Sequence, residues 1–521
     1  MSTAPPSFPR LCAPILLALC TAPTLGAQIT AVAAPAEAQA FGPAELQALV
    51  EHAFEVFDPI GLAVAVVDGG ELVFEFGVGE RRKGSGEAVT PQTLFNIASC
   101  TKAFTAACVG KLISAGRIRW DDPVVRHLPE FRLEDPWITR HLTVRDLLCH
   151  RSGLSTFEGD LLWYGSELDD AEVLRRMERL PICRRFREQF GYQNLMYLVA
   201  GMLIERVSGQ SWPDFLRAEL LDPLGMDGSA STRAELPADA EVASPHLDGR
   251  PIAPYDFRAA KAAGAMWSSV DELARWIRML VAGGRFEDRQ VLDEDVLQAC
   301  WRPCVSLAGG RVPAAIEDFS SYGLGWFLSV HEGEKLVEHD GGMPGFLSKV
   351  TLLPAEGFGL AILNNGADGL LNLALRRAIL AQREGHDGHV ILDELAATAA
   401  RRRAAATAAT ERRIAARQMG TSPSLPLTGF AGRFEDRLLG PAVMRCDDAG
   451  LQLVIEASPA TLHGTLSHWH HDVFRVDFAD PLLPFALVRF SLDTQGAVDG
   501  FRIDCPIDDF DFASLDFRVQ R

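Results

Sequence analysis

The sequence predicts an α+β or α/β protein, with a sheet layered by helices and a small all-β domain after it. Residues 61–67 and 71–78 are two strand-like runs joined by an Asp-Gly-Gly turn, which is a strong hairpin pattern. Strand-like runs return over residues 322–363 after a long helical stretch. We therefore expect both ends of this region to meet in one sheet.

Helical periodicity marks the elements of the first half. Apolar residues fall on one face of residues 43–57, and Pro43 suits a first helical turn. A further helix is predicted from Ser99 to residue 112, and a mainly helical region follows. In that region Thr143 is an expected N-cap, and Ser268 or Ser269 caps another helix.

The second half predicts strands, a helix, a linker and a barrel. Strands are expected over residues 322–327, 336–339, 346–353 and 359–363, with a helix over 371–382. The Ala/Arg-rich stretch that follows predicts a solvated helix or linker. Short alternating segments then indicate a barrel or sandwich. The predicted divisions are a leader (1–40), a main domain (41–385), a linker helix (386–425) and a β-barrel (426–521).

Composition excludes some partners. The chain has 50 basic and 69 acidic residues among 521, a net charge of −19. This balance argues against a nucleic-acid groove or an anionic membrane surface. We therefore expect a small-molecule or peptide substrate, and the sequence leaves the oligomeric state open.

The first 40 residues resemble a secretory signal. Arg10 is the only charged residue before Glu37, and residues 11–20 form a short apolar run. Small residues follow, with expected cleavage after Ala27 or Ala40. The run is too short to span a membrane. The prediction is a periplasmic or secreted protein with no membrane span after the leader is removed.

No metal or organic cofactor is predicted. The cysteines form no C-x-x-C pair, and Cys300 and Cys304 have no histidine cluster beside them in the sequence. His468 and His470, which would share one face of a strand, are the alternative that we considered. We interpret them as ordinary strand residues.

Ser99 and Lys102 form a candidate catalytic pair. Residues three apart on a helix share a face, so the Lys102 ammonium can reach the Ser99 hydroxyl. A serine becomes an effective nucleophile only beside a base, and the helix start favours a deprotonated oxygen. Cys100 turns off this face and is expected in the core.

Two further segments supply candidate partners. Tyr192 precedes a helix, and a lysine ammonium beside it would push its phenol toward the phenolate. Asn194 can both donate and accept. On a predicted strand, Gly341 and Gly342 follow His339 and permit close backbone approach. The backbone N–H group of Gly342, together with that of Ser99, would form an oxyanion hole.

These segments together resemble the serine β-lactamase-related family, which includes class C β-lactamases, D-aminopeptidases and penicillin-binding-type esterases. The similarity covers about residues 41–383 and implies an antiparallel β-lactamase-like sheet with flanking helices and a large helical insertion. Residues 426–521 resemble a lipocalin-like domain found after this domain in some members. The matching segments, in family order, are residues 93–102, 142–154, 192–194, 223–226, 263–269, 322–326 and 339–346.

The resemblance implies a role for each candidate residue. Ser99 would be the acylated nucleophile, Lys102 its helical partner and Tyr192 the general base. His339 stands where lactamases usually have lysine. Asp340 stands at the next position, where a threonine is common in the family. It would either place a carboxylate near the site or point away from it, and the substitutions argue against potent β-lactamase activity.

We therefore expect a serine hydrolase that cleaves an amide or ester through an acyl-enzyme on Ser99. Asn194, His339, Asp340, Gly341 and Gly342 are the expected substrate-binding or oxyanion residues. The alternative is a penicillin-binding receptor or cell-wall binding module that acylates without efficient turnover. The choice between esterase and D-amino-acid peptidase stays open.

Overall fold

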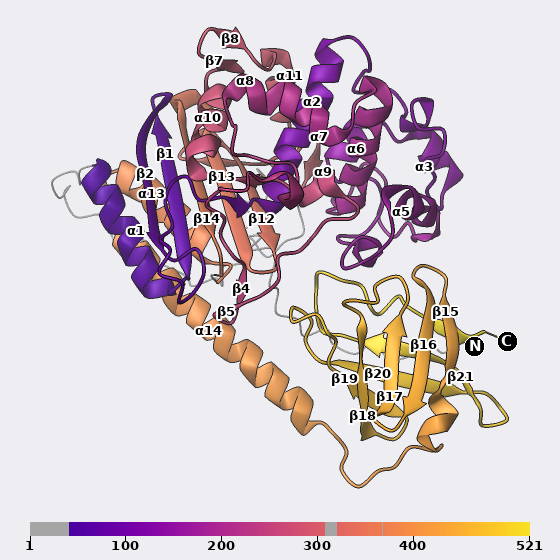
Figure 1. Ribbon diagram of the computed structural model, residues 1–521. Coiled ribbons are helices and arrows are strands. Elements are labelled where there is room, and N and C mark those ends of the chain that lie inside the picture. Colours follow the sequence, from indigo (N-terminus) through magenta and orange to yellow (C-terminus); the bar gives the residue numbers. More distant parts are fainter. Residues whose placement is uncertain (1–40, 308–319, 367, 521) are drawn as a thin grey trace. The chain divides into compact units, whose positions relative to one another are not determined.

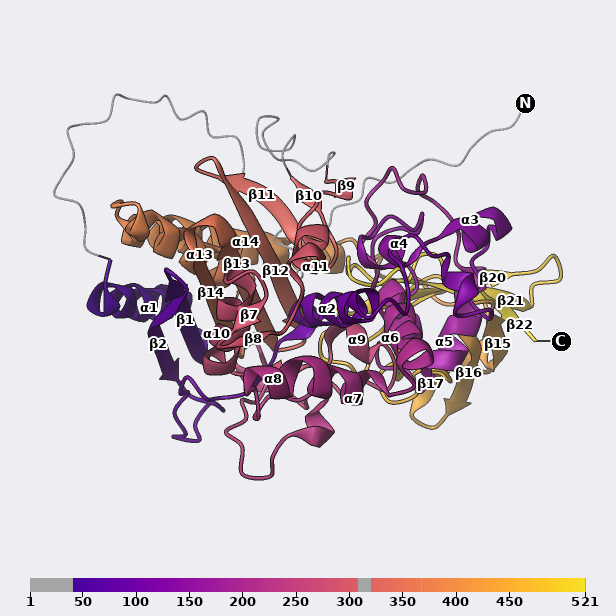
Figure 2. The ribbon, with the colours of Figure 1, turned by 90° about the horizontal axis from the view of Figure 1, so that it is seen from above.

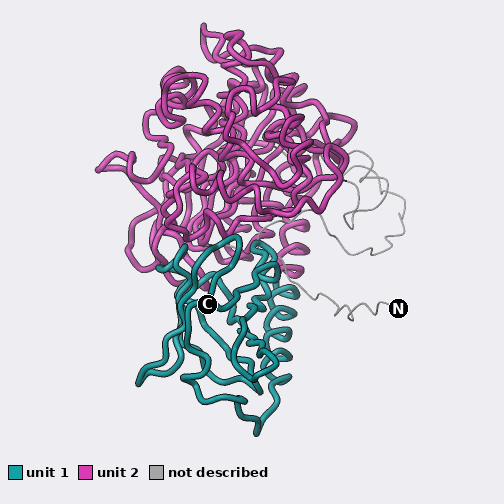
Figure 3. Tube along the Cα trace, turned by 90° about the vertical axis from the view of Figure 1, so that its right-hand side faces the viewer, with its two compact units in different colours: residues 1–17, 400–521 teal, residues 18–399 magenta. Residues whose placement is uncertain are grey.

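A computed structural model of the chain describes residues 41–307, 320–366 and 368–520. The predicted leader and its cleavage positions lie outside the described residues and stay predictions. The described part of the chain divides into two compact units, one within residues 41–399 and the other within residues 400–520 (Figure 3). None of the helices within the described ranges is long and apolar enough to cross a membrane.

An antiparallel sheet forms the centre of the larger unit. Its strands are β1 (Gly61–Asp68), β2 (Glu71–Gly79), β9 (Val305–Ser306), β10 (Ser321–Tyr322), β11 (Phe327–His331), β12 (Glu334–Met343), β13 (Phe346–Leu353) and β14 (Phe358–Asn364). Their order is β2-β1-β14-β13-β12-β11-β10-β9 (Figure 1). Because β1 pairs with β14, with Leu62 opposite Asn364, the expected meeting of the two ends is confirmed.

Helices cover both faces of this sheet (Figure 2). On one face α1 (Pro43–Phe57) and α13 (Leu371–Arg383) pack together, and Leu49 and Leu375 join Val64 and Ile362 in a buried core. On the other face α10 (Val270–Val281) packs against β1 and β14. The continuous apolar run of β1 is explained by this arrangement, because a strand covered on both faces has no polar side.

The helical insertion between β2 and β9 carries most of the remaining helices. These are α2 (Thr101–Ser114), α3 (Pro136–His141), α4 (Val144–Leu148), α5 (Asp170–Arg176), α6 (Asn194–Ser208), α7 (Trp212–Leu216), α8 (Asp222–Leu224), α9 (Lys261–Gly264) and α11 (Glu294–Cys300). Three short ladders pair β3 (Phe95–Asn96) with β6 (Trp267–Ser268), β4 (His246–Leu247) with β5 (Arg250–Pro251), and β7 (Arg285–Phe286) with β8 (Arg289–Gln290). Thr143 caps α4 as predicted, and Ser269 is the residue that caps α10.

One predicted strand is wrong. The run 322–327 is expected as a single strand, but Tyr322 ends β10 and Phe327 begins β11, and the two residues pair as a hairpin. Gly325 makes this turn possible, because its φ is +80°. A Cβ on Gly325 would also lie 2.9 Å from the carbonyl oxygen of Lys102. The glycines that fit a strand pattern in the sequence therefore form a turn, and this turn packs against α2.

The smaller unit is a closed barrel, which confirms the predicted all-β domain. Its strands, in order around the barrel, are β15 (Gly432–Asp436), β16 (Gly440–Asp447), β17 (Gly450–Ile455), β18 (His463–His470), β19 (Val473–Val476), β20 (Ala486–Leu492), β21 (Val498–Asp504) and β22 (Phe517–Val519). Phenylalanines such as Phe430, Phe474 and Phe490 pack together inside it.

A long helix, α14 (Gly388–Ala415), occupies most of the predicted linker. Few of its residues are buried, Leu392 and Ala399 among them, which agrees with its Ala/Arg-rich composition. Near its end, Arg413 donates hydrogen bonds to the carbonyl oxygens of Phe485 and Asp504 at 2.7 and 2.8 Å. These bonds attach the end of the helix to the barrel.

Candidate active site

Ser99 lies in a single 3-10 turn, Ala98–Cys100, immediately ahead of α2. The turn begins with strained backbone, since Ala98 has a φ of +46°. The side chain of Asn96 supports this conformation by accepting a hydrogen bond from the Ala98 N–H at 3.0 Å. Backbone outliers of this kind occur most often at functional sites. The turn leaves Ser99 partly exposed between buried neighbours.

Lys102 is completely buried below this turn. Its Nζ donates hydrogen bonds to Ser99 Oγ at 3.0 Å, Asn194 Oδ1 at 2.7 Å and the Ala263 carbonyl oxygen at 2.8 Å. The predicted contact between Ser99 and Lys102 is therefore present. Burial lowers the pKa of Lys102 to about 7, although the carboxylate of Asp160 acts in the opposite direction.

The partners of Lys102 orient its nitrogen. A carbonyl oxygen can only accept, so Ala263 and Asn194 each take one proton from Nζ. Asn194 cannot turn its amide around, because its Nδ2 donates to Asp160 Oδ2 at 2.6 Å. The third position of the nitrogen faces Ser99. It holds a proton in the ammonium form and a lone pair in the neutral amine.

Tyr192 is buried beside this pair. Lys102 Nζ lies 4.9 Å from the centre of its ring. Burial raises the pKa of Tyr192 above its usual value, and the nearby Ser99 hydroxyl offsets only part of this effect. The expectation that a lysine ammonium pushes this phenol toward the phenolate is therefore wrong. The loss of water outweighs the attraction, and a lysine with a pKa near 7 is only partly charged.

The side chain of His339, on β12, lies on the same side as Tyr192, and its imidazole is neutral. Its Nδ1 donates to the carbonyl oxygen of Asp340 at 2.6 Å, so its Nε2 is the acceptor for the Tyr322 hydroxyl at 2.9 Å. Burial, reinforced by the nearby charge of Lys102, lowers the pKa of His339 to about 3. His339 therefore brings no positive charge to the position where lactamases usually have lysine.

The two glycines of β12 lie next to the Ser99 turn. A Cβ on Gly341 would lie 2.2 Å from the Ile97 carbonyl oxygen and 3.1 Å from the Ser99 nitrogen. Gly341 therefore allows β12 to lie close to the turn that carries Ser99. Gly342 pairs with Leu347 of β13. The pairing of β12 with β11 ends at Glu338, so β11 does not cover this part of the strand.

Asp340 does not join the group around Ser99. Its carboxylate pairs with Lys349 Nζ at 2.7 Å, and Lys349 also pairs with Glu338 at 3.1 Å. Arg376 of α13 completes this cluster through Glu338. Since α13 covers the opposite face of the sheet from α2, the side chain of Asp340 points away from the site. Of the two orientations expected for it, this is the one that the structure shows.

Sequence reasoning missed two residues of the site. Asp160, which holds Asn194, follows a loop glycine, and no motif marks it. His150 lies inside a segment used for the family resemblance, but no role was predicted for it. Its Nδ1 accepts from the Gln193 N–H at 3.0 Å, and its ring centre lies 4.2 Å from that of Tyr192. Only a contact map could have identified either residue.

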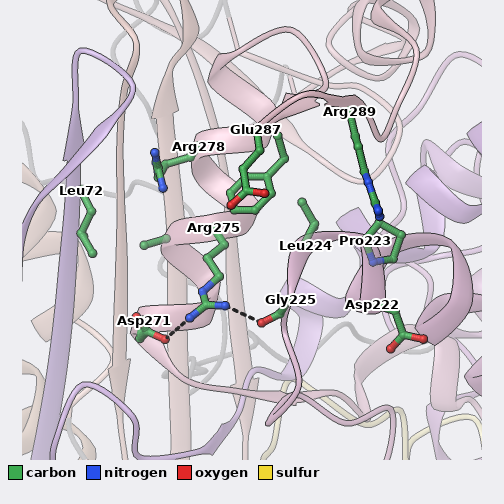
Figure 4. A pocket seen from close by; sticks show the side chains of 12 residues that line it. Leu72, Asp222, Pro223, Leu224, Gly225, Asp271, Arg275, Arg278, Glu287 and Arg289 are labelled. Carbon is green, nitrogen blue, oxygen red and sulfur yellow. Dashed lines mark hydrogen bonds and ion pairs between the residues drawn. The ribbon is translucent and has the colours of Figure 1, made fainter.

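A separate surface hollow of about 600 Å3 contains none of these residues (Figure 4). Two of its three arginines are engaged by neighbouring acceptors. Arg275 contacts Asp271 at 3.3 Å and donates to the Gly225 carbonyl oxygen at 2.6 Å. Arg278 donates to Glu71 at 2.9 Å. The hollow therefore lacks the nucleophile and base that the Ser99 site combines.

The histidines of the barrel do not assemble a metal site. His468 Nε2 donates to the His471 carbonyl oxygen at 2.9 Å, and His471 contacts Gln418 at 3.0 Å. Across the part of the chain that the structure describes, no group of three His, Cys, Asp or Glu side chains is placed to hold a metal ion.

Comparison with protein families gives two matches. A family described as "Beta-lactamase" matches residues 48–384, and a domain of unknown function, DUF3471, matches residues 416–520. The first match contains every residue of the Ser99 site. The second contains the barrel.

Named relatives match more than half of the chain. The "Unguisins hydrolase ungD'" of Aspergillus campestris is 31% identical over 318 residues, which cover 57% of this chain and 57% of that protein. "Penicillin-binding protein 4" of Amycolatopsis lactamdurans is 30% identical over 326 residues, 59% of this chain and 81% of that protein. The chain thus spans less than two thirds of the length of the unguisins hydrolase.

Solved structures share the fold. The octameric penicillin-binding protein homologue from Pyrococcus abyssi has a TM-score of 0.60 at 21% identity, and the match covers 91% of this chain and 99% of that one. The structure of SurE gives a TM-score of 0.53 at 22% identity over 92% of this chain and 99% of that one. At these identities, the similarity shows a common architecture.

Proposed function

The chain belongs to the beta-lactamase family, and from this premise we propose that it is a serine hydrolase that cleaves an ester or amide through an acyl-enzyme on Ser99. One observation carries the proposal. Lys102 is buried among neutral acceptors, and the one position left on its nitrogen faces the Ser99 hydroxyl at 3.0 Å. A base with a pKa near the working pH is well suited to take that proton.

In the acylation step, neutral Lys102 accepts the Ser99 proton as Oγ attacks the substrate carbonyl carbon. The backbone N–H groups of Ser99 and Gly342 hold the oxygen on which negative charge develops. Tyr192 keeps its own proton at neutral pH. It donates that proton to the leaving group and then takes the proton that Lys102 holds directly from its ammonium, because acylated Ser99 has no proton to pass on. Water then attacks the acyl-enzyme by the reverse proton path and releases the acid.

The surroundings of the site favour substrates that bind without a carboxylate group contacting the enzyme. His339 is neutral, and Asp340 points to the other face of β12. Neither residue offers the cation that would bind an acidic substrate group. We therefore expect neutral esters or peptide amides to be better substrates than β-lactams. The names of relatives fit both hydrolysis and covalent capture, since one is an unguisins hydrolase and another a penicillin-binding protein.

Active-site labelling tests the proposal. A fluorophosphonate probe should label the wild-type protein and fail to label Ser99→Ala, because only an activated serine attacks the phosphorus centre. The exposed serine variant Ser85→Ala is the matched control and should label like wild type. Equal labelling of Ser99→Ala would refute the assignment of the nucleophile.

Turnover separates the hydrolase from a receptor that only acylates. A panel of p-nitrophenyl esters, D-amino-acid amides and nitrocefin should give steady hydrolysis of at least one ester or amide, lost in Ser99→Ala. A stoichiometric burst with no steady state on any substrate would instead indicate a receptor or binding module.

A further inference from the structure

A buried serine of the central sheet, Ser348 on β13, is hydrogen bonded to the turn that carries Ser99. Its Oγ donates to the Ile97 carbonyl oxygen at 2.6 Å. Because Ser348 is buried, its hydroxyl depends on partners inside the protein. Ile97 precedes Ser99 by two residues. The bond therefore joins the sheet to the backbone just before the candidate nucleophile.

The absence of a side chain at Gly341 makes this bond possible. Gly341 lies directly opposite Ser348 in the pairing of β12 with β13, and opposite residues project to the same face of a sheet. A Cβ on Gly341 would lie 2.1 Å from Ser348 Oγ and 2.2 Å from the Ile97 carbonyl oxygen. A side chain at this position would thus occupy the space in which the hydroxyl and the carbonyl meet.

Cys100 makes a second connection, on the other side of Ser99. Its buried thiol donates to the His339 carbonyl oxygen of β12 at 3.3 Å, and its sulfur lies 3.3 Å from Ser348 Oγ. Burial raises the pKa of Cys100 to about 12, so the thiol keeps the proton that this bond needs. The sheet therefore holds the turn both before and after the candidate nucleophile.

These two connections act on a strained segment. Ala98, the residue before Ser99, has a φ of +46°, a conformation that disfavours residues with a side chain. Such a conformation persists only where the surrounding contacts over-determine it. Asn96 supplies one of these contacts from within the turn. Ser348 and Cys100 supply the others from the sheet.

We propose that Ser348 is a positioning residue that sets the distance between the backbone N–H groups of Ser99 and Gly342. These groups are the two oxyanion donors of the proposed function, on which this inference rests. The hydroxyl proton of Ser348 is committed to a backbone carbonyl, so the residue acts through the turn and not by contact with substrate. Donors that are fixed in advance stabilise the charge that develops in the transition state. The expected effect is therefore on kcat.

Steady-state kinetics on a p-nitrophenyl ester tests this role. Ser348→Ala should lower kcat roughly 10-fold and change KM less than about 2-fold, because a displaced donor weakens binding of the transition state more than that of the substrate. The inhibition constant of phenylboronic acid should rise by the factor by which kcat/KM falls, since its tetrahedral adduct on Ser99 would use the same two donors. An unchanged kcat, or a rise in KM alone, would overturn the proposal.

A pair of variants with equal shape isolates the hydroxyl. Threonine and valine fill nearly the same volume, but only threonine keeps a donor for the Ile97 carbonyl oxygen. Ser348→Thr should therefore have a kcat at least about 5-fold higher than that of Ser348→Val, per folded molecule. Equal values in the two variants would mean that packing at this position matters and the hydrogen bond does not.

Thr351→Val is the control for a purely structural effect. Thr351 is also buried on β13, and its hydroxyl donates to Glu338 at 3.4 Å. It lies three residues after Ser348, so its side chain projects to the opposite face of the sheet. Thr351→Val and Ser348→Ala should both lower the Tm, but only Ser348→Ala should lower kcat. A similar fall of kcat in both variants would contradict a positioning role.

Failure of the proposed function would have a different signature. In that case the wild-type protein would be as inactive toward every ester and amide as Ser99→Ala, and both proposals would be overturned. Active wild type with a kcat that Ser348→Ala leaves unchanged would overturn only the role of Ser348.

Discussion

Lys102 and Lys349 are both buried lysines of the larger unit, and each has several polar partners. Lys102 contacts a hydroxyl, an amide oxygen and a backbone carbonyl, and its pKa falls to about 7. Lys349, on the opposite face of the sheet, contacts the carboxylates of Glu338 and Asp340. Burial acts against its charge as well, but these carboxylates raise its pKa above the usual value.

The comparison shows that the partners of a buried lysine, and not its burial alone, decide what it can do. Neutral acceptors orient the Lys102 nitrogen and stabilise its charge less than carboxylates in contact would, so the residue can exchange a proton near neutral pH. Carboxylates keep Lys349 charged, so it serves to hold β12 and β13 together. The same substitution, lysine to methionine, should therefore mainly lower activity at Lys102 and mainly lower stability at Lys349.

The largest effect is expected from Lys102→Met. Removal of the base should lower kcat for a p-nitrophenyl ester by roughly 10^3-fold, in the range typical of general-base catalysis. Lys102→Arg should be similarly inactive, because a guanidinium keeps its proton. Lys349→Met is the control and should retain most of the activity per folded molecule. Substantial activity in Lys102→Arg would contradict the assigned base.

Lys349→Met should produce the largest loss of stability. It removes the cation beside the half-exposed Asp340 carboxylate and leaves Glu338 with Arg376 alone. We expect a loss of roughly 1–3 kcal/mol of unfolding free energy, between the values for exposed and buried ion pairs. Urea denaturation measures the loss. Lys102→Met should lower the free energy of unfolding less, because the acceptors that contact its Nζ are neutral oxygens. Equal losses in the two variants would remove the distinction between these lysines.

Tyr192→Phe should have an intermediate effect on activity. If the phenol delivers a proton to the leaving group, kcat should fall about 10^2-fold for an amide. The loss should be smaller for a p-nitrophenyl ester, whose leaving group needs no proton. Rates on matched amide and ester substrates measure this ratio. An equal loss on both would mean that Tyr192 acts in another step.

The smallest effect is a shift in pH dependence. Because Lys102 must be neutral to accept a proton, kcat/KM should rise with pH through a midpoint near 7. The Asp160 carboxylate raises the pKa of Lys102, so Asp160→Asn should move this midpoint to lower pH. Asp340→Asn, on the other face of β12, should leave it in place. A midpoint that moves to higher pH in Asp160→Asn would contradict the electrostatic role of this carboxylate.

Much of the fold could be predicted from local patterns. The hairpin after α1, the helix of residues 43–57 and the all-β character of the last domain follow from periodicity and turn residues, which act over short distances. The strand expected over residues 322–327 is wrong for a related reason. Its glycines fit an extended run as well as a turn, and only the packing of Gly325 against α2 selects the turn.

The site could be predicted less completely than the fold. Motifs identified Ser99, Lys102, Tyr192 and His339 as candidates. They do not indicate which of these side chains carry a charge in the folded protein. The phenolate expected for Tyr192 assumed a charged lysine, whereas burial of both groups reverses the direction of the pKa shift. Asp160 was missed because its role depends on Asn194, which α6 brings beside it.

The sequence by itself determined that Ser99 and Lys102 meet, because residues three apart at a helix start share a face whatever surrounds them. It also determined the order of the motifs that place the chain in its family. Only the tertiary structure decided that Lys102 is buried among neutral acceptors with a lowered pKa, whereas Lys349 lies between carboxylates that raise its pKa. The energy of a charge depends on the water removed and the partners supplied, and both come from segments that are distant in the sequence.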